Sequence, residues 1–319
     1  MKKMLALLFT LGLVSSLAGG ALAALEHPEI AFCTGEPGAI FNTLGEAMVS
    51  VLKKEIPGRK FAVVTTSGSN INCKQVGMAN REIGFTQEET LRMAIKGGNR
   101  KAGFDASLPN IRVVSRLHSH FIHVMVRNDA GIKNLSDLKG KKIALGPAGS
   151  GSAAVVGSLL ESAGFTSKDL SGTSYSPVAG YASKLQSKQL DAAIVVQGLQ
   201  SQLVAKALAS GAVLLPVTPE ASQNMAATND SYHPNSIPKG TYPGQDQDVP
   251  TMATSIFLIT HAGVDNQIVY SITKTLYSEG MANAHPLLKQ LSLQKAAQNP
   301  PVALHPGAER FYKEKGVIK

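Results

Sequence analysis

The chain has 319 residues and a formal net charge of +9 at pH 7, a length that suits one large domain or two medium ones. Its basic residues are scattered, and no dense basic run is interleaved with aromatic residues, which argues against nucleic-acid binding. The positive charge favours capture of anions, although scattered surface lysines explain it equally well.

The first 23 residues have the pattern of a secretory signal peptide. Lys2 and Lys3 form a positive start, an apolar stretch follows, and the end of this segment fits cleavage after Ala23. The apolar stretch is short and is interrupted by Gly and Ser, which disfavours a retained membrane anchor. We therefore expect an exported soluble protein.

A rhythm of strand, loop and helix recurs along the chain. The expected strands cover 29–35, 60–66, 81–87, 111–117, 121–127, 141–145, 191–198, 213–217 and 254–260. The expected helices cover 44–52, 71–79, 155–163, 199–210 and 266–281. This alternation predicts an α/β protein with parallel sheets and helices on both faces. Residues 218–251 lack periodicity and are expected to form a long ordered loop.

Three turns between a strand and a helix are candidate binding loops. They are TGEPG at 34–38, SGSN at 67–70 and GPAGSGS at 146–152. In open α/β sheets, ligands bind at the carboxyl ends of the strands, where these loops lie. The first N–H groups of a helix carry partial positive charge, so each turn can hold a carboxylate or can merely cap its helix. Together the three turns favour a cleft for a small polar or anionic ligand.

The third loop does not fit the motifs of nucleotide binding or covalent catalysis. No Lys precedes Ser152, which disfavours a P-loop, and the dinucleotide fingerprint is also missing. Neither Ser150 nor Ser152 has the Gly-x-Ser-x-Gly frame of a nucleophile elbow. We find no convincing catalytic constellation, and we expect a protein that is not an enzyme and has no cofactor.

Three histidines and two cysteines are candidates for a metal site and a disulfide. On a strand, His118 and His120 share a face while His123 points the other way, which disfavours a metal site and favours surface or hinge positions. Cys33 and Cys73 flank the first two candidate loops. In an exported protein they can form a disulfide or remain two buried free thiols.

The chain resembles the TAXI family, the extracytoplasmic solute receptors of TRAP-type transporters, nearly end to end after the signal peptide. The matching pieces are TGEPGAIFNTLGEAM, TSGSNINCKQVGMANREIGFTQ, HVMVRNDAGIKNLSDLKGKKIALGPAGSGS, YPGQDQDVPT and HPGAERFYKE. This resemblance implies a two-lobed periplasmic-binding-protein type II fold, with two parallel-type sheets flanked by helices and a ligand cleft between the lobes. It also implies a glutamate-like amino acid or dicarboxylate as the solute and a TRAP-type membrane permease as the partner. We expect a monomer.

The resemblance also implies a set of ligand-binding residues. The positions that match the family's contacts are Gly38, Phe41, Ser67, Ser69, Asn70, Gln87, Ser150, Ser152 and Tyr242. We add Gly151 from the third loop, and Asn42 and Gln197, which depart from the family's pattern. Glu36 is a further departure, and it can pair with a ligand ammonium or face solvent.

No arginine lies in the candidate loops. An arginine–carboxylate clamp is therefore not expected, and Arg116 or Arg127 pointing into the cleft would contradict this expectation.

We expect lobe 1 to comprise residues 24–127 and 252–319, and lobe 2 to comprise residues 128–251. The segments 121–127 and 254–260 are then the connections between the lobes. Two alternatives to a transport receptor remain open, namely a binding protein that serves a sensor and, as the weaker alternative, a serine hydrolase.

Overall fold

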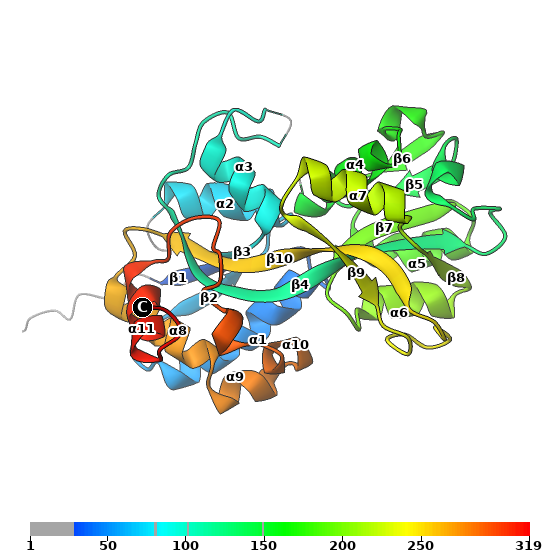
Figure 1. Ribbon diagram of the computed structural model, residues 1–319. Coiled ribbons are helices and arrows are strands. Elements are labelled where there is room, and N and C mark those ends of the chain that lie inside the picture. The colour runs from blue at the N-terminus through cyan, green and yellow to red at the C-terminus, as the bar shows by residue number, and fades with distance from the viewer. Residues whose placement is uncertain (1–28, 80–81, 101, 149) are drawn as a thin grey trace, which may run out of the picture.

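The computed structural model describes residues 29–79, 82–100, 102–148 and 150–319, and the expected signal peptide lies outside the described residues. Two lobes lie side by side, and two long strands, β4 (Ile111–Arg127) and β10 (Val249–His261), run from one lobe into the other (Figure 1). Within the described ranges, no helix is both long enough and apolar enough to cross a membrane.

Lobe 1 contains both ends of the described chain. Its strands are β1 (Ile30–Cys33), β2 (Phe61–Val64) and β3 (Glu82–Gln87). Its helices are α1 (Ile40–Glu55), α2 (Ser69–Met78), α3 (Glu88–Lys96), α8 (Asn266–Leu276), α9 (Glu279–Ala284), α10 (Pro286–Lys289) and α11 (Pro306–Glu314), with a 3-10 turn η4 (Leu293–Lys295). Strand β1 pairs in parallel with both β2 and β3, as the strand–helix rhythm predicts.

Lobe 2 repeats this arrangement. Its strands are β5 (Lys142–Ala144), β6 (Gly172–Ser174), β7 (Ala192–Gln197), β8 (Ala212–Leu215) and β9 (Tyr232–Ile237). Its helices are α4 (Gly151–Ser162), α5 (Tyr181–Gln186), α6 (Gln202–Ala209) and α7 (Pro219–Thr228), with 3-10 turns η1 (Leu135–Leu138), η2 (Ser167–Asp169) and η3 (Val178–Gly180). Strand β5 pairs in parallel with β6 and β7.

The parallel strands of the two lobes belong to one hydrogen-bonded sheet. Its order among the described residues is β2-β1-β3-β10-β4-β7-β5-β6, with β8 on β4 and β9 on β10. Strands β4 and β10 are antiparallel to their neighbours and to each other. At about 3.3 Å per residue, a strand as long as β4 spans roughly 55 Å, enough to cross both lobes. The segments 111–117 and 121–127 are therefore one strand, where the sequence pattern predicted two.

Residues 218–251 do not form the long loop that their lack of periodicity predicted. Thr218 caps α7 by accepting a hydrogen bond from the amide of Ala221 at 3.2 Å, and Pro219 occupies the first turn of this helix. The following residues form β9, which pairs antiparallel with β10. Thr218 and Pro219 are thus a helix-start signal within a polar, loop-like composition.

Each lobe has its own apolar core. In lobe 1 one cluster packs α1 and α8 against the sheet around Phe32 and Ile256, and a second lies around Val76 and Phe257. In lobe 2 one cluster is centred on α4 and a second lies around Tyr181. The sheet is therefore continuous while the cores are separate.

The two cysteines are not bridged. Both are buried free thiols, and their partners differ. The Cys33 thiol donates to Gln75 Oε1 at 2.9 Å, whereas the Cys73 thiol lies 3.3 Å from Thr86 Oγ1. Of the two alternatives that the sequence left open, the structure has the free thiols.

Candidate functional site

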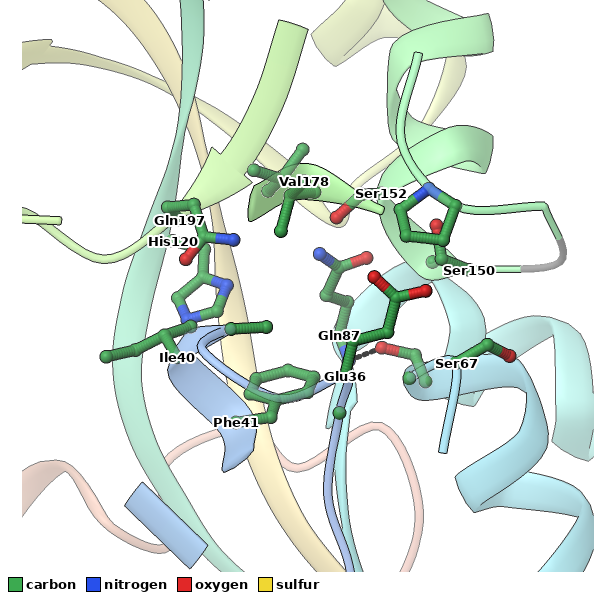
Figure 2. A pocket seen from close by; sticks show the side chains of 17 residues that line it. Glu36, Ile40, Phe41, Ser67, Gln87, His120, Ser150, Ser152, Val178 and Gln197 are labelled. Carbon is green, nitrogen blue, oxygen red and sulfur yellow. Dashed lines mark hydrogen bonds between the residues drawn. The ribbon is translucent and has the colours of Figure 1, made fainter. Parts of the chain in front are cut away.

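A pocket lies between the lobes, where the loops after β1, β2 and β5 meet (Figure 2). Lobe 1 lines it with Gly35, Glu36, Ala39, Ile40, Phe41, Ser67, Gly68, Ser69, Gln87 and His120. Lobe 2 lines it with Pro147, Ser150, Gly151, Ser152, Val178, Val196 and Gln197. The cavity volume is about 50 Å³. This volume exceeds the roughly 10–15 Å³ that a cavity needs to hold one water molecule, so the site suits a small solute.

The lobe 1 side of the pocket is held in place by one buried amide. The side chain of Asn72 donates to the carbonyl oxygens of Thr34 at 2.7 Å and Phe85 at 2.8 Å. Its Oδ1 accepts from Thr66 Oγ1 at 2.6 Å, and Thr66 Oγ1 in turn accepts from the amide of Gly68. These bonds tie the first and second loops to β3. Asn72 therefore positions the site without lining it.

Helix starts from both lobes point at the pocket. Ser69 begins α2, Gly151 begins α4, and both residues line the cavity. The free amides at a helix start carry partial positive charge, so both ends attract an anion. Ser150 caps α4 by accepting from the amide of Ala153 at 3.1 Å. Helix capping and pocket lining, which the sequence posed as alternatives, thus coincide at Ser150.

The lobes touch each other inside the pocket at Gly151. A Cβ atom added to Gly151 would lie 2.4 Å from Gln87 Oε1 and 2.8 Å from Ser69 Oγ, both across the cleft. Only a residue without a side chain allows this approach. The third loop is therefore in direct contact with lobe 1.

Two buried side-chain oxygens of the pocket, Gln87 Oε1 and Glu36 Oε2, have no hydrogen-bond partner among the described residues. The same holds for His120 Nδ1. Burial raises the pKa of the Glu36 carboxyl, and the amide of Val178 across the cleft lowers it to a smaller extent. Buried polar atoms are normally paired, so the two oxygens are available for a ligand.

The described lining residues include no lysine or arginine. Arg127 instead forms ion pairs with Asp191 and Asp129, each at 3.1 Å. The backbone amides at the helix starts are therefore the candidate positive groups at the pocket.

The histidines of β4 are more deeply buried than expected. His120 and His123 are buried, so the predicted surface position is wrong for both, while their position on a lobe-crossing strand agrees with a hinge. His118 and His120 do share a face, with their Nε2 atoms 3.1 Å apart. His120 stacks on Phe41 with ring centroids 5.2 Å apart, and burial lowers its pKa well below the usual value. It therefore lines the pocket as a neutral ring.

Eight of the predicted ligand-binding residues line the pocket, namely Phe41, Ser67, Ser69, Gln87, Ser150, Gly151, Ser152 and Gln197. The other four are placed elsewhere. Gly38 is exposed beside a neighbouring cavity, and Asn42 is buried on α1. Asn70 donates to the carbonyl of Ala102, and Tyr242 Oη bonds to Nε2 of His123 on the lobe-crossing strand β4 at 2.8 Å. The last two side chains hold neighbouring loops and strands together.

Five lining residues lie outside both the predicted ligand-binding set and the three candidate loops, namely Ala39, Ile40, His120, Val178 and Val196. The sequence pattern favoured a surface or hinge position for His120. Val178 follows β6, so the rule that ligands bind at the carboxyl ends of strands could have found it. His120 lies in the middle of a strand, where no such rule applies.

Solved structures with the same architecture define the class of fold. The periplasmic binding protein BugD is 13% identical with a TM-score of 0.55, over 91% of this chain and 95% of BugD. MatC from Rhodopseudomonas palustris, in a structure with bound malate, is 15% identical with a TM-score of 0.54, over 91% and 99% of the two chains. R. palustris Rpa4515, in a structure with adipate, is 15% identical with a TM-score of 0.51, over 91% and 95%. The protein thus has the two-lobed fold of periplasmic binding proteins.

The family follows from a separate comparison. The model of the NMT1-like family matches residues 32–316, which is nearly all of the described chain. The chain therefore belongs to the NMT1-like family.

Proposed function

We propose that this protein is an extracytoplasmic receptor that captures a small carboxylate-bearing solute between its lobes. The observation that carries the proposal is the meeting of the α2 and α4 helix starts at one pocket, beside a buried and unpaired Gln87 amide oxygen. Helix starts bind carboxylates, and the pocket holds no catalytic pair that we can assign. Malate and adipate, bound by proteins of the same fold, are both carboxylates.

Closure of the lobes is the proposed mechanism of capture. Residues from both lobes line the pocket, so a bound solute makes its full set of contacts only when the lobes are together. We propose lobe 1 as residues 24–127 with 252–319 and lobe 2 as residues 128–251, although the lobe 2 cores also include Ile122, Val124, Met125, Val126 and Met252 of the two connecting strands. Bending would then occur in β4 and β10 near these boundaries.

We further propose that the receptor is a TAXI-type protein that delivers its solute to a TRAP-type permease, and that it acts in the periplasm as a monomer after cleavage at Ala23. The support is the sequence resemblance given above and a fold shared with periplasmic proteins. A permease gene beside the gene for this chain, and loss of uptake on its deletion, would separate transport from a sensing role.

The proposal is tested by calorimetric titration of residues 24–319 with L-glutamate, L-leucine, 2-oxoglutarate, malate and adipate, and with glucose and acetamide as uncharged controls. At least one carboxylate is expected to bind and to raise the melting temperature. Binding of an uncharged control alone, or of no carboxylate, would contradict it.

A further inference from the structure

A second cavity lies between the lobes, next to the pocket. Its volume is about 310 Å³, against about 50 Å³ for the pocket. Ile40, the first residue of α1, and Gln197, the last residue of β7, line both cavities. In Figure 2 these two side chains lie on the opposite side of the pocket from Ser67 and Ser150. A solute whose head lies at the helix starts therefore has its other end toward the second cavity.

Both lobes meet directly at this second cavity. Lobe 1 lines it mainly from α1 and α10, and lobe 2 lines it from the segment between Gln197 and Leu203. A Cβ atom added to Gly198 of this segment would lie 2.9 Å from Leu287 Cδ1 of α10. The contact resembles that of Gly151 with lobe 1 in the pocket. The second cavity is therefore complete only when the lobes are together, as the pocket is.

The walls of the second cavity are uncharged. Its described lining residues include no aspartate, glutamate, lysine or arginine. The one ionisable side chain among them is His285, whose Nδ1 accepts a hydrogen bond from the amide of Leu287 at 3.1 Å. Burial lowers the pKa of His285, so its ring is neutral at pH 7. The apolar part of the wall consists of Ile40, Leu199, Leu203, Pro286 and Leu287. A hydrocarbon chain can be buried against such a wall, whereas a second carboxylate would have no charged partner there.

We propose that the second cavity is a tail site, which binds the uncharged hydrocarbon chain of a monocarboxylate whose carboxylate lies at the starts of α2 and α4. This inference rests on the proposed function, and it adds the length and the charge of the rest of the solute. Ile40 and Gln197 then form the passage between the two cavities. Such a solute differs from the glutamate-like amino acids and dicarboxylates that the sequence resemblance implies.

The inference is tested by calorimetric titration with compounds that keep the carboxylate and vary the tail. The monocarboxylates are butanoate, hexanoate and octanoate. Adipate and octanedioate are dicarboxylates of matched length, and octanamide is the uncharged control. We expect the affinity to rise about fourfold for each methylene group that is added to the monocarboxylate. Octanoate should bind at least about tenfold more tightly than octanedioate or octanamide.

The outcomes separate this inference from the proposed function. Affinity that does not rise with chain length would overturn the inference, as would octanedioate or octanamide that binds as tightly as octanoate. If no monocarboxylate of the series binds while adipate, malate, 2-oxoglutarate or an amino acid does, the inference fails and the proposed function stands. If no carboxylate of any kind binds, both fail.

The variant Thr43→Trp tests where the tail lies. Thr43 is an exposed residue of α1 that lines the second cavity but not the pocket, so the larger side chain should occupy part of the tail site. Ser50→Trp is the matched control, because Ser50 is an exposed residue of the same helix outside both cavities. The ratio of octanoate affinity to butanoate affinity should fall at least about tenfold in Thr43→Trp and keep its parent value in Ser50→Trp. Both variants should melt as the parent does without solute. An equal ratio in all three proteins would contradict the assignment of the second cavity to the tail.

Discussion

Single residues at the pocket decide how closely the lobes approach and what they can hold. Gly151 meets Gln87 and Ser69 across the cleft, and Asn72 fixes the two lobe 1 loops from behind. Neither role follows from hydrophobicity or secondary structure. Each depends on the size or the hydrogen-bonding capacity of one side chain, and each can be tested by one substitution.

Replacing Gly151 with alanine should weaken solute binding. The new methyl group would lie 2.4 Å from Gln87 Oε1. This clash would hold the lobes apart. Overpacking of this kind costs about 1–3 kcal/mol, or roughly 5- to 150-fold in affinity. Gly157→Ala on the same helix is the control, because nothing lies within 4 Å of its added Cβ. Calorimetry uses the compound that binds most tightly in the titrations given under Proposed function, and it should show weaker binding only for Gly151→Ala. Equal affinities of Gly151→Ala and Gly157→Ala for this compound would refute the role of the Gly151 contact.

Replacing Asn72 with alanine should destabilise the fold. The substitution removes the Asn72 donor from the buried carbonyl oxygens of Thr34 and Phe85, although the Thr34 oxygen can still accept from Thr66 Oγ1. We expect the free energy of unfolding in urea to fall by about 1–3 kcal/mol. Asn128→Ala, at an exposed position, should change it by less than about 0.5 kcal/mol. A similar small change in both variants would show that the Asn72 network is dispensable.

Both thiols should be unreactive in the folded protein. Cys33 and Cys73 are 1% and 0% exposed, and burial raises the pKa of each thiol to about 12. Reactivity requires the thiolate and access. A thiol reagent should therefore label neither cysteine in buffer and both in urea without reductant. A mass two protons lighter, with no labelling in urea, would instead show a disulfide.

At the scale of elements, α3 of lobe 1 meets α4 and β9 of lobe 2 outside the pocket. Glu89 of α3 accepts hydrogen bonds from Asn229 at 3.0 Å, from Ser158 at 3.4 Å and from the hydroxyl of Tyr232. All three donors belong to lobe 2. This buried contact forms only when the lobes are together, so it contributes to the stability of the closed state independently of the solute.

The Glu89 contact should make solute binding depend on pH. In the closed state the pKa of Glu89 is raised to about 7, mainly by burial and to a smaller extent by the charge of Glu161. The hydrogen bonds from Ser158 and Asn229 lower this pKa but do not offset the effect of burial. In the open state Glu89 is free to ionise near its ordinary pKa of 4.5. Closure therefore favours the protonated carboxyl, and this contribution is lost as the pH rises from about 5 to 7.

Calorimetric titrations across this range should show affinity falling by about one to two orders of magnitude up to about pH 7 and then levelling off, because each pH unit between the two pKa values costs at most a factor of ten. Glu89→Gln removes the titrating group and should flatten this part of the profile. Glu220→Gln, at an exposed position of α7, should not. An unchanged profile in Glu89→Gln would assign the pH dependence to another group.

At the scale of the whole molecule, the sequence predicted the α/β class and the loops that line the pocket. Those predictions worked because strand and helix periods are local signals and because the carboxyl ends of parallel strands meet at one edge. The single sheet was not predicted, since the pairing of β4 with β10 joins residues far apart in the chain. The roles of Asn72 and His120 were missed for the same reason. Their partners are brought near only by the fold.

The most direct test of lobe closure around a solute is small-angle scattering from residues 24–319, with and without a saturating amount of the tightest-binding compound of the panel. Capture in a closing cleft predicts a smaller radius of gyration with the solute, and a weaker decrease for Gly151→Ala at the same occupancy. A radius of gyration that does not change on binding would contradict the proposed mechanism.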